Sequence, residues 1–322
     1  MPIPEGLPEN VFYAIAVIYG LLIFASVVVA VMKRMALGEA QTEAMAELSK
    51  RVTSWWFMIT IFTVAIVTNR IVSTVFLAFM TFLAFKEYLS LIQTRRVDRL
   101  ILLFAYWTIP AQFYFAHLNS YGLFLTFIPV WTFLFIPMAM TLAGKTEGFL
   151  RAVGTISWGL MITVFALSHT AMLLAADESV AGPAGGAGLL LFLVALTQFN
   201  DVAQFTWGKL FGRHKIVPKV SPKKTWEGFL GGLASTILGA AIAGPYLTPL
   251  PFYYAAAAGA MIAIAGFLGD ITISAFKRDL GVKDSGGLIP GHGGILDRVD
   301  SLTYAAPVFY YAMHFFVFSG RV

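Results

Sequence analysis

The stretch AGLLLFLVALTQFND, residues 187–201, decides what kind of protein this is. It is apolar for most of its length and ends in Asn200 and Asp201. Leu189 to Leu196 show none of the alternation of polar and apolar residues that a strand of a membrane barrel requires. Apolar runs of about 17 to 25 residues cross the roughly 30 Å hydrocarbon core of a bilayer as helices. The stretch therefore predicts a membrane helix with a carboxylate, Asp201, inside its apolar run.

The rest of the chain has a similar composition. Of its 322 residues, 58% are hydrophobic and only 12% are charged, about half the charged share of a soluble domain. Backbone groups in lipid must bond within their own segment, so helices are expected. We predict an all-α polytopic membrane protein of about ten helices, at residues 11–32, 54–68, 70–85, 100–116, 121–142, 151–175, 187–207, 229–248, 252–276 and 301–318.

The sequence leaves one feature of this division open. Residues 54–68 and 70–85 are short and meet at Asn69, so 54–85 could be a re-entrant or single element, which would leave nine helices. We also divide the chain into N-terminal membrane helices, residues 1–185, and C-terminal membrane helices that carry catalytic loops, residues 186–322.

The basic residues predict the orientation. With the N-terminus outside the cytosol, all 22 lysines and arginines except Arg70 and Arg321 lie on the cytosolic side, as the positive-inside rule requires. The N-terminus lacks the basic region of a cleavable signal peptide, so residues 11–32 are expected to be a retained helix. The glycine-rich stretch 177–188 on the other side is interpreted as a flexible connector. The absence of cysteine excludes disulfides, zinc-thiolate sites and cysteine nucleophiles.

Polar residues cluster first in residues 199–232, FNDVAQFTWGKLFGRHKIVPKVSPKKTWEGFLGG. A carboxylate near the membrane interior costs about 2.5 to 3.5 kcal/mol, so Asp201 either has a partner or a task, or it ends the helix and reaches water. Ser221, Lys223 and Lys224 precede Thr225 and a new helix, whose start suits an anion. The two lysines make a candidate phosphate site, although a basic cytosolic loop is also what topology alone demands.

The second cluster is residues 269–301, GDITISAFKRDLGVKDSGGLIPGHGGILDRVDS. Asp270, Ser274 and Lys277 are spaced to lie on one face of a helix. Asp297 and Asp300 are three residues apart and share a side of the last helix. Mg²⁺ is held by one or two carboxylates plus substrate phosphates, which makes Asp270 and Asp297 the leading ligands.

Between these carboxylates lies the glycine-rich segment KDSGGLIPGHGG, residues 283–294. Its glycines allow backbone N–H groups to approach phosphate oxygens closely, with Lys283 and His292 as further donors. A structural turn held by salt bridges is the alternative, but polar groups in membrane segments are functional by default. Lys86 and Glu87, at the end of the third helix, are either a local ion pair or a support for the site.

The second cluster resembles the signature of the phosphatidate cytidylyltransferases, or CDP-diacylglycerol synthases. The matching positions are Ser274, Phe276, Lys277, Arg278, Lys283, Asp284, Gly286, Ile289, Pro290, His292, Gly293, Gly294, Ile295, Asp297, Arg298 and Asp300. Residues 221–228 and Gly269-Asp270 resemble two further landmarks. The resemblance covers roughly the C-terminal 120 residues. One departure is Asp201-Val202-Ala203-Gln204-Phe205, where the family pattern has small residues followed by tyrosine, which puts a detail of CTP binding in doubt.

The resemblance implies the reaction CTP + phosphatidate → CDP-diacylglycerol + pyrophosphate on the cytosolic face of a bacterial inner membrane. It implies Mg²⁺ at Asp270 and Asp297 with Asp300 beside them, and leaves room for a second metal ion such as K⁺. Lys277 and Arg278 would act with these carboxylates in catalysis. Substrate binding would fall to Asp201, Ser221, Lys223, Lys224, Lys283, Asp284, His292, Gly293, Gly294 and Arg298. Partners are CTP, phosphatidate and the bilayer, with a homodimer as one expected assembly and no nucleic acid.

Two other function classes are alternatives for this sequence. A related CTP-dependent lipid enzyme, such as a polyprenol kinase or a CDP-archaeol-type synthase, would share much of the site. An ion-coupled transporter could use Asp201 and Asp270 as a relay. Transporters often carry inverted repeats with broken helices in both halves, whereas these polar motifs crowd into one half.

Overall fold

The computed structural model describes residues 8–35, 39–144, 146–287 and 293–319. Within these ranges the protein is helical, and an isolated β-bridge joins Lys215 and Thr225. Nine of the described helical segments are long and apolar enough to cross a membrane. The fold is therefore that of an all-α polytopic membrane protein, as the sequence predicts.

The N-terminal half supplies the first six of these segments. They are α1 (Glu9–Met35), α2 (Glu39–Thr68), α3 (Arg70–Leu91), α4 (Arg99–His117), a segment that runs through α5 (Tyr121–Thr126), a π-helical turn (Phe127–Thr132) and α6 (Phe133–Leu142), and one that runs through α7 (Phe149–Gly159), a second π-helical turn (Leu160–Phe165) and α8 (Ala166–Leu174).

The C-terminal half supplies three long helices and the shorter elements around the site. These are α9 (Glu178–Ala181), α10 (Gly185–Phe211), α11 (Trp226–Leu247), α12 (Phe252–Asp279), the single turn α13 (Leu296–Val299) and α14 (Leu302–Met313), which continues as a π-helical turn (His314–Phe318).

The structure resolves the choice at Asn69. α2 and α3 are separate helices of 30 and 22 residues, and the Asn69 side chain caps α3 by accepting the N–H of Val72 at 2.9 Å. The re-entrant alternative for residues 54–85 is therefore wrong. The tenth predicted segment, 301–318, is helical but falls outside the nine because α14 and its π-helical turn together have 17 residues, fewer than any of the nine.

Two sequence interpretations need correction. The helix predicted at residues 54–68 begins earlier, since α2 is continuous from Glu39 to Thr68. The glycine-rich stretch 177–188 is packed rather than loose. Ala181 and Ala184 are fully buried, and a side chain at Gly182 would collide with the backbone of Pro249.

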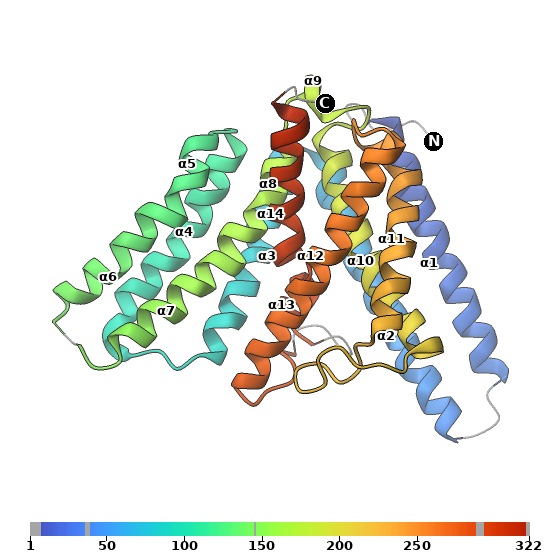
Figure 1. Ribbon diagram of the computed structural model, residues 1–322, viewed down its shortest axis with the longest axis horizontal. Helices are drawn as coiled ribbons and strands as arrows, with labels where there is room; N and C mark the ends of the chain where they lie inside the picture. The colour runs from blue at the N-terminus through green and yellow to red at the C-terminus, as the bar shows by residue number, and fades with distance from the viewer. Residues whose placement is uncertain (1–7, 36–38, 145, 288–292, 320–322) are drawn as a thin grey trace.

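α10, α11 and α12 stand side by side, with α3, α8 and α14 in the middle of the molecule and α4 to α7 on the far side (Figure 1). Small residues permit this packing: a Cβ on Gly244 or Gly259 would overlap a neighbouring alanine. Lipid offers little hydrophobic drive for helix association, so close contact and interhelical hydrogen bonds supply it. The buried core includes residues of both halves, and the division at residue 185 stays a prediction.

Two connections meet at one end of these helices. The chain between α10 and α11 and residues 280–287 after α12 both lie at the lower end in Figure 1. Thr225 caps α11 by accepting the N–H of Gly228 at 3.2 Å. This end of the bundle carries the polar residues that the sequence singled out.

Candidate active site

Five aspartates line one polar cavity of about 640 Å³, Asp284 of the segment after α12 and four from other elements. Asp201 comes from α10, Asp270 from α12, Asp297 from α13, and Asp300 from the residues that lead into α14. The predicted helix face is confirmed, because Ser274 Oγ donates to Asp270 Oδ1 at 3.2 Å and both Asp270 and Lys277 reach the cavity. The polar motifs, far apart in the sequence, thus form one site.

Asp270 forms an ion pair with the loop before α11. Lys224 Nζ lies 2.6 Å from Asp270 Oδ2 and donates to Gln204 Oε1 at 3.1 Å. Burial acts to lower the pKa of Lys224, but the Asp270 and Asp201 carboxylates outweigh it and raise that pKa above its ordinary value. Gln204, which departs from the family pattern, therefore orients one of the predicted phosphate-binding lysines.

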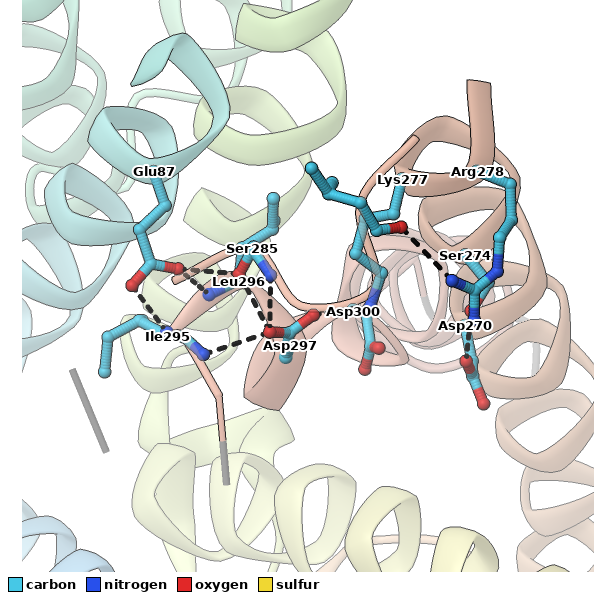
Figure 2. Close-up of polar contacts among 12 residues, drawn as sticks. Glu87, Asp270, Ser274, Lys277, Arg278, Ser285, Ile295, Leu296, Asp297 and Asp300 are labelled. Carbon is cyan, nitrogen blue, oxygen red and sulfur yellow. Dashed lines mark hydrogen bonds and ion pairs between the residues drawn. The ribbon is translucent and has the colours of Figure 1, made fainter. Parts of the chain in front are cut away.

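Asp297 is held by four donors. Lys277 Nζ lies 2.5 Å from Oδ1, and Oδ2 accepts the N–H groups of Ser285 and Gly294 at 2.8 and 3.0 Å and faces Ser285 Oγ at 3.0 Å (Figure 2). Burial acts to raise the pKa of Asp297, but Lys277 and the Gly294 N–H hold it below its usual value. Both oxygens are engaged within the protein.

Asp201 and Asp300 are bonded to the chain around Ser301. Ser301 Oγ lies 3.0 Å from an oxygen of Asp201, and the Ser301 N–H donates to Asp300 at 2.8 Å. Within the described ranges, neither carboxylate lies in an ion pair. Burial, followed by the neighbouring Asp270 and Asp201, raises the pKa of Asp300 well above its usual value. Among the described residues, the cavity thus contains two carboxylates that are in no direct ion pair.

The loop before α11 is folded as a short hairpin. Lys215 pairs with Thr225, and the Ile216 N–H donates to Lys224 O at 3.2 Å. Glu227 accepts the N–H groups of Arg213 and His214 at 3.0 and 3.2 Å, and its other oxygen lies 2.6 Å from His214 Nδ1. These contacts hold in place the residues that the hairpin contributes to the cavity, Lys215, Ser221, Lys223 and Lys224.

The remaining predicted residues fall in three groups. Lys283, Asp284, Gly293 and Arg298 line a second cavity beside the first. Arg278 lines neither cavity and donates instead to the carbonyl oxygens of Val220 and Val282, both at 3.2 Å, so its catalytic role stays a prediction. His292 lies outside the described residues.

The second cavity is a groove of about 1150 Å³ between α1, α2 and α10. Most of its lining is apolar, including Ile18 and Leu22 of α1, Phe62 of α2 and Val194 of α10. Its polar end is lined by Asp201, Asp284, Asp297, Arg298 and Asp300, all of which also line the polar cavity. An apolar groove and a charged pocket therefore meet at the aspartates.

The sequence did not establish the role of Glu87. Its carboxylate, near the end of α3, accepts the N–H groups of Ile295 and Leu296 rather than pairing with Lys86 (Figure 2). The charge of Glu87 inside an apolar helix was a signal that it had a partner, but nothing in the sequence indicated which one.

The donors fit a hard cation only in part. Carboxylate oxygens with excess negative charge are the ligands that Mg²⁺ prefers. However, no three Asp, Glu or His side chains within the described ranges are placed to hold a metal ion. In addition, the carboxylates of Asp270 and Asp297 already form ion pairs with Lys224 and Lys277. The predicted ligand set Asp270, Asp297 and Asp300 is thus incomplete without substrate oxygens, and metal binding stays a prediction.

Comparison with known proteins adds the family. Residues 49–316 match the model of the cytidylyltransferase family. This chain belongs to the cytidylyltransferase family. Membership makes it a nucleotidyltransferase, and the resemblance noted in its C-terminal motifs is confirmed.

The similarity to individual relatives covers different shares of this chain. The chain is 44% identical over 302 residues to the uncharacterized protein YnbB of Escherichia coli strain K12, covering 94% of this chain and 98% of that one. It is 43% identical over 143 residues to the phosphatidate cytidylyltransferase of Haemophilus influenzae, 42% of this chain and 48% of the relative. The corresponding enzyme of Mycobacterium bovis is 40% identical over 124 residues, 38% of this chain and 40% of the relative. The chain thus matches less than half the length of the relatives with a named activity.

Proposed function

We propose that this protein catalyses CTP + phosphatidate → CDP-diacylglycerol + pyrophosphate at the cytosolic surface of the membrane. The observation that carries the proposal is the meeting of an apolar groove with a lysine-lined polar cavity at one set of aspartates. A reaction between a lipid phosphate and a nucleoside triphosphate needs this arrangement, because its substrates come from solvents of opposite polarity.

The groove has the character of a site for acyl chains. Along α10 its lining runs from Asp201 to Leu191, about 15 Å at the helical rise of roughly 1.5 Å per residue. An acyl chain in this position would place the phosphate of phosphatidate near Asp201, Arg298 and Asp300. Arg298 is the cation that both cavities share.

The polar cavity suits a triphosphate. Lys209, Lys215, Lys223, Lys224 and Lys277 line it together, and positive side chains placed around transferring phosphates are the main catalytic device in such reactions. Relatives named phosphatidate cytidylyltransferases supply the choice of CTP.

The chemistry needs alignment more than an activated side chain. An oxygen of the phosphatidate phosphate attacks the α-phosphorus of CTP, a new P–O bond forms, and the bond from the α-phosphorus to the bridging oxygen breaks, releasing pyrophosphate. The attacking oxygen is already anionic, so no general base is required. The lysines lower the repulsion between the two anions and neutralise charge on the leaving group.

Mg²⁺ is part of this proposal. Asp270 and Asp300, with Asp297 beside them, would hold it together with phosphate oxygens of the substrates. When bound, it would neutralise charge on the transferring phosphate. A second ion such as K⁺ would find donors among the same carboxylates.

The deciding assay uses purified protein in detergent with Mg²⁺, CTP labelled in the α-phosphate, and phosphatidate. We expect a labelled CDP-lipid and unlabelled pyrophosphate, with the product lost in EDTA or in Asp297→Ala. If the label remains in free CDP while the lipid gains a phosphate, the protein is a kinase. Product formed only from an archaeal-type lipid phosphate would indicate a CDP-archaeol-type synthase. Failure to form any nucleotide product, with ion flux in sealed vesicles, would favour the transporter.

A further inference from the structure

Glu87 receives hydrogen bonds from residues that lie about two thirds of the chain away from it. Oε1 accepts the Ile295 N–H at 2.9 Å, and Oε2 accepts the Leu296 N–H at 2.8 Å and the Ser285 hydroxyl at 2.9 Å (Figure 2). The sequence separations are 208, 209 and 198 residues. A buried carboxylate of α3 therefore contacts the loop and the single turn that carry Asp297.

Two glycines leave space for the Glu87 carboxylate. A Cβ on Gly294 would overlap Glu87 Oε2, and one on Gly286 would lie only 3.0 Å from Oε1. Both glycines belong to the signature segment. At these positions, therefore, the absence of a side chain makes room for Glu87.

Glu87 is linked to the site through Ser285. The hydroxyl of Ser285 lies between Glu87 Oε2 and Asp297 Oδ2, at 2.9 and 3.0 Å. The Ser285 hydroxyl has one proton and cannot donate a full hydrogen bond to both carboxylates at once, so Glu87 and Asp297 share this donor. Since Asp297 also holds Lys277, a continuous series of contacts joins α3 to α12.

We propose that Glu87 is a positioning residue that holds α13 and the loop before it in the conformation needed for catalysis. α13 has only four residues, too few to satisfy its first N–H groups or to hold its own orientation. Glu87 lines neither cavity, so it acts through other groups and not on the substrates. The inference rests on the proposed function and adds a residue of the N-terminal half to its site.

The variant Glu87→Gln tests this positioning role, because it removes the charge and keeps the size of the side chain. Both carboxylate oxygens accept a backbone N–H, so either orientation of a Gln amide places its NH₂ against a donor. We expect kcat to fall about 10- to 100-fold, the cost of losing a hydrogen bond to a charged group. The KM for CTP is expected to stay within about threefold, because the lysines of the polar cavity belong to other elements.

Controls separate positioning from general damage. Lys86→Gln changes the neighbouring exposed residue of α3 and is expected to retain wild-type kcat. Glu87→Asp keeps the charge and should recover part of the activity lost in Glu87→Ala. Ser285→Ala combined with Glu87→Gln should lose less than the product of the two single effects, since both act through one hydroxyl.

Hydrogen exchange of residues 285–299 provides a readout that does not depend on activity. In Glu87→Gln the Ile295 and Leu296 amides should exchange faster while exchange in the other helices is unchanged. The inference is overturned if Glu87→Gln leaves both exchange and kcat unchanged, if its loss of kcat merely follows the fraction of unfolded protein, or if Lys86→Gln has the same effect. A wild-type protein that forms no CDP-lipid overturns the proposed function instead, and the exchange result still decides whether Glu87 holds this turn.

Discussion

Residues of one type have different tasks in this site. Both carboxylate oxygens of Asp297 accept hydrogen bonds from the protein, and these bonds organise the chain around it. Asp270 is balanced by Lys224, whereas Asp300 faces other carboxylates without a cation of its own. Asp297 thus organises the site, whereas Asp300, within the described residues, is in no ion pair.

Lys224 is the residue on which the charge balance of the polar cavity depends most directly. In Lys224→Met, Asp270 loses its counter-charge, Gln204 loses its donor, and the triphosphate loses a cation. We expect the KM for CTP to rise about tenfold or more, measured with phosphatidate at saturation. Lys219→Met is the matched control, because Lys219 is in the same hairpin but lines neither cavity. An unchanged KM in Lys224→Met would remove this lysine from nucleotide binding.

At the scale of elements, buried polar contacts set how the helices of the site stand against each other. Asn200 is fully buried on α10. It accepts from Thr236 Oγ1 of α11 at 3.2 Å and donates to Ala263 O of α12 at 3.3 Å. Since α10 and α12 carry Asp201 and Asp270, this one amide aligns the helices that present two of the five aspartates of the polar cavity.

Replacing Asn200 by leucine should therefore loosen the contact among these three helices. We expect a loss of about 1 kcal/mol in the free energy of unfolding, the usual value of an interhelical hydrogen bond in a membrane, measured by unfolding in mixed detergent micelles. Thr197→Val is the control, because the hydroxyl of Thr197 bonds only within its own helix, to Leu193 O. Equal losses in the two variants would contradict a specific role for the three-helix contact.

At the scale of the whole molecule, the site needs both halves of the chain. The groove is built from α1, α2 and α10, and Glu87 of α3 holds the turn that carries Asp297. The N-terminal helices, which carry no signature, thus form the wall that would receive the lipid.

A bulky residue in that wall should affect long lipids more than short ones. In Ile18→Trp we expect the rate with long-chain phosphatidate to fall about tenfold, through overpacking of the groove, while dihexanoyl phosphatidate reacts at the wild-type rate. Val17→Trp, at a position 62% exposed and outside the groove, should leave both rates unchanged. Equal inhibition with both lipids would show that acyl chains do not occupy this groove.

Orientation can be tested because the chain has no cysteine of its own. Gly287 lies in the loop after α12 and Gly122 at the start of α5, and a Cβ at either position meets no atom within 4 Å. A maleimide that cannot cross membranes should label Gly287→Cys only in inside-out vesicles and Gly122→Cys only in intact spheroplasts. The reverse pattern would place the site on the outer face.

The amino-acid sequence by itself determined the helical membrane architecture, because the bilayer leaves few structures for long apolar runs. It also determined that Asp270 and Lys277 share one face and that Asp297 and Asp300 lie close together, since these are local consequences of the helical repeat. It could not distinguish a re-entrant element from two helices at Asn69, or recognise the stretch 177–188 as packed, because both depend on neighbours distant in sequence. Only the tertiary structure paired Lys224 with Asp270, joined the groove to the polar cavity, and brought Glu87 to the turn before Asp297. Such contacts depend on how the helices pack. The local pattern of residues predicts each helix but does not indicate which other helix or loop it will contact.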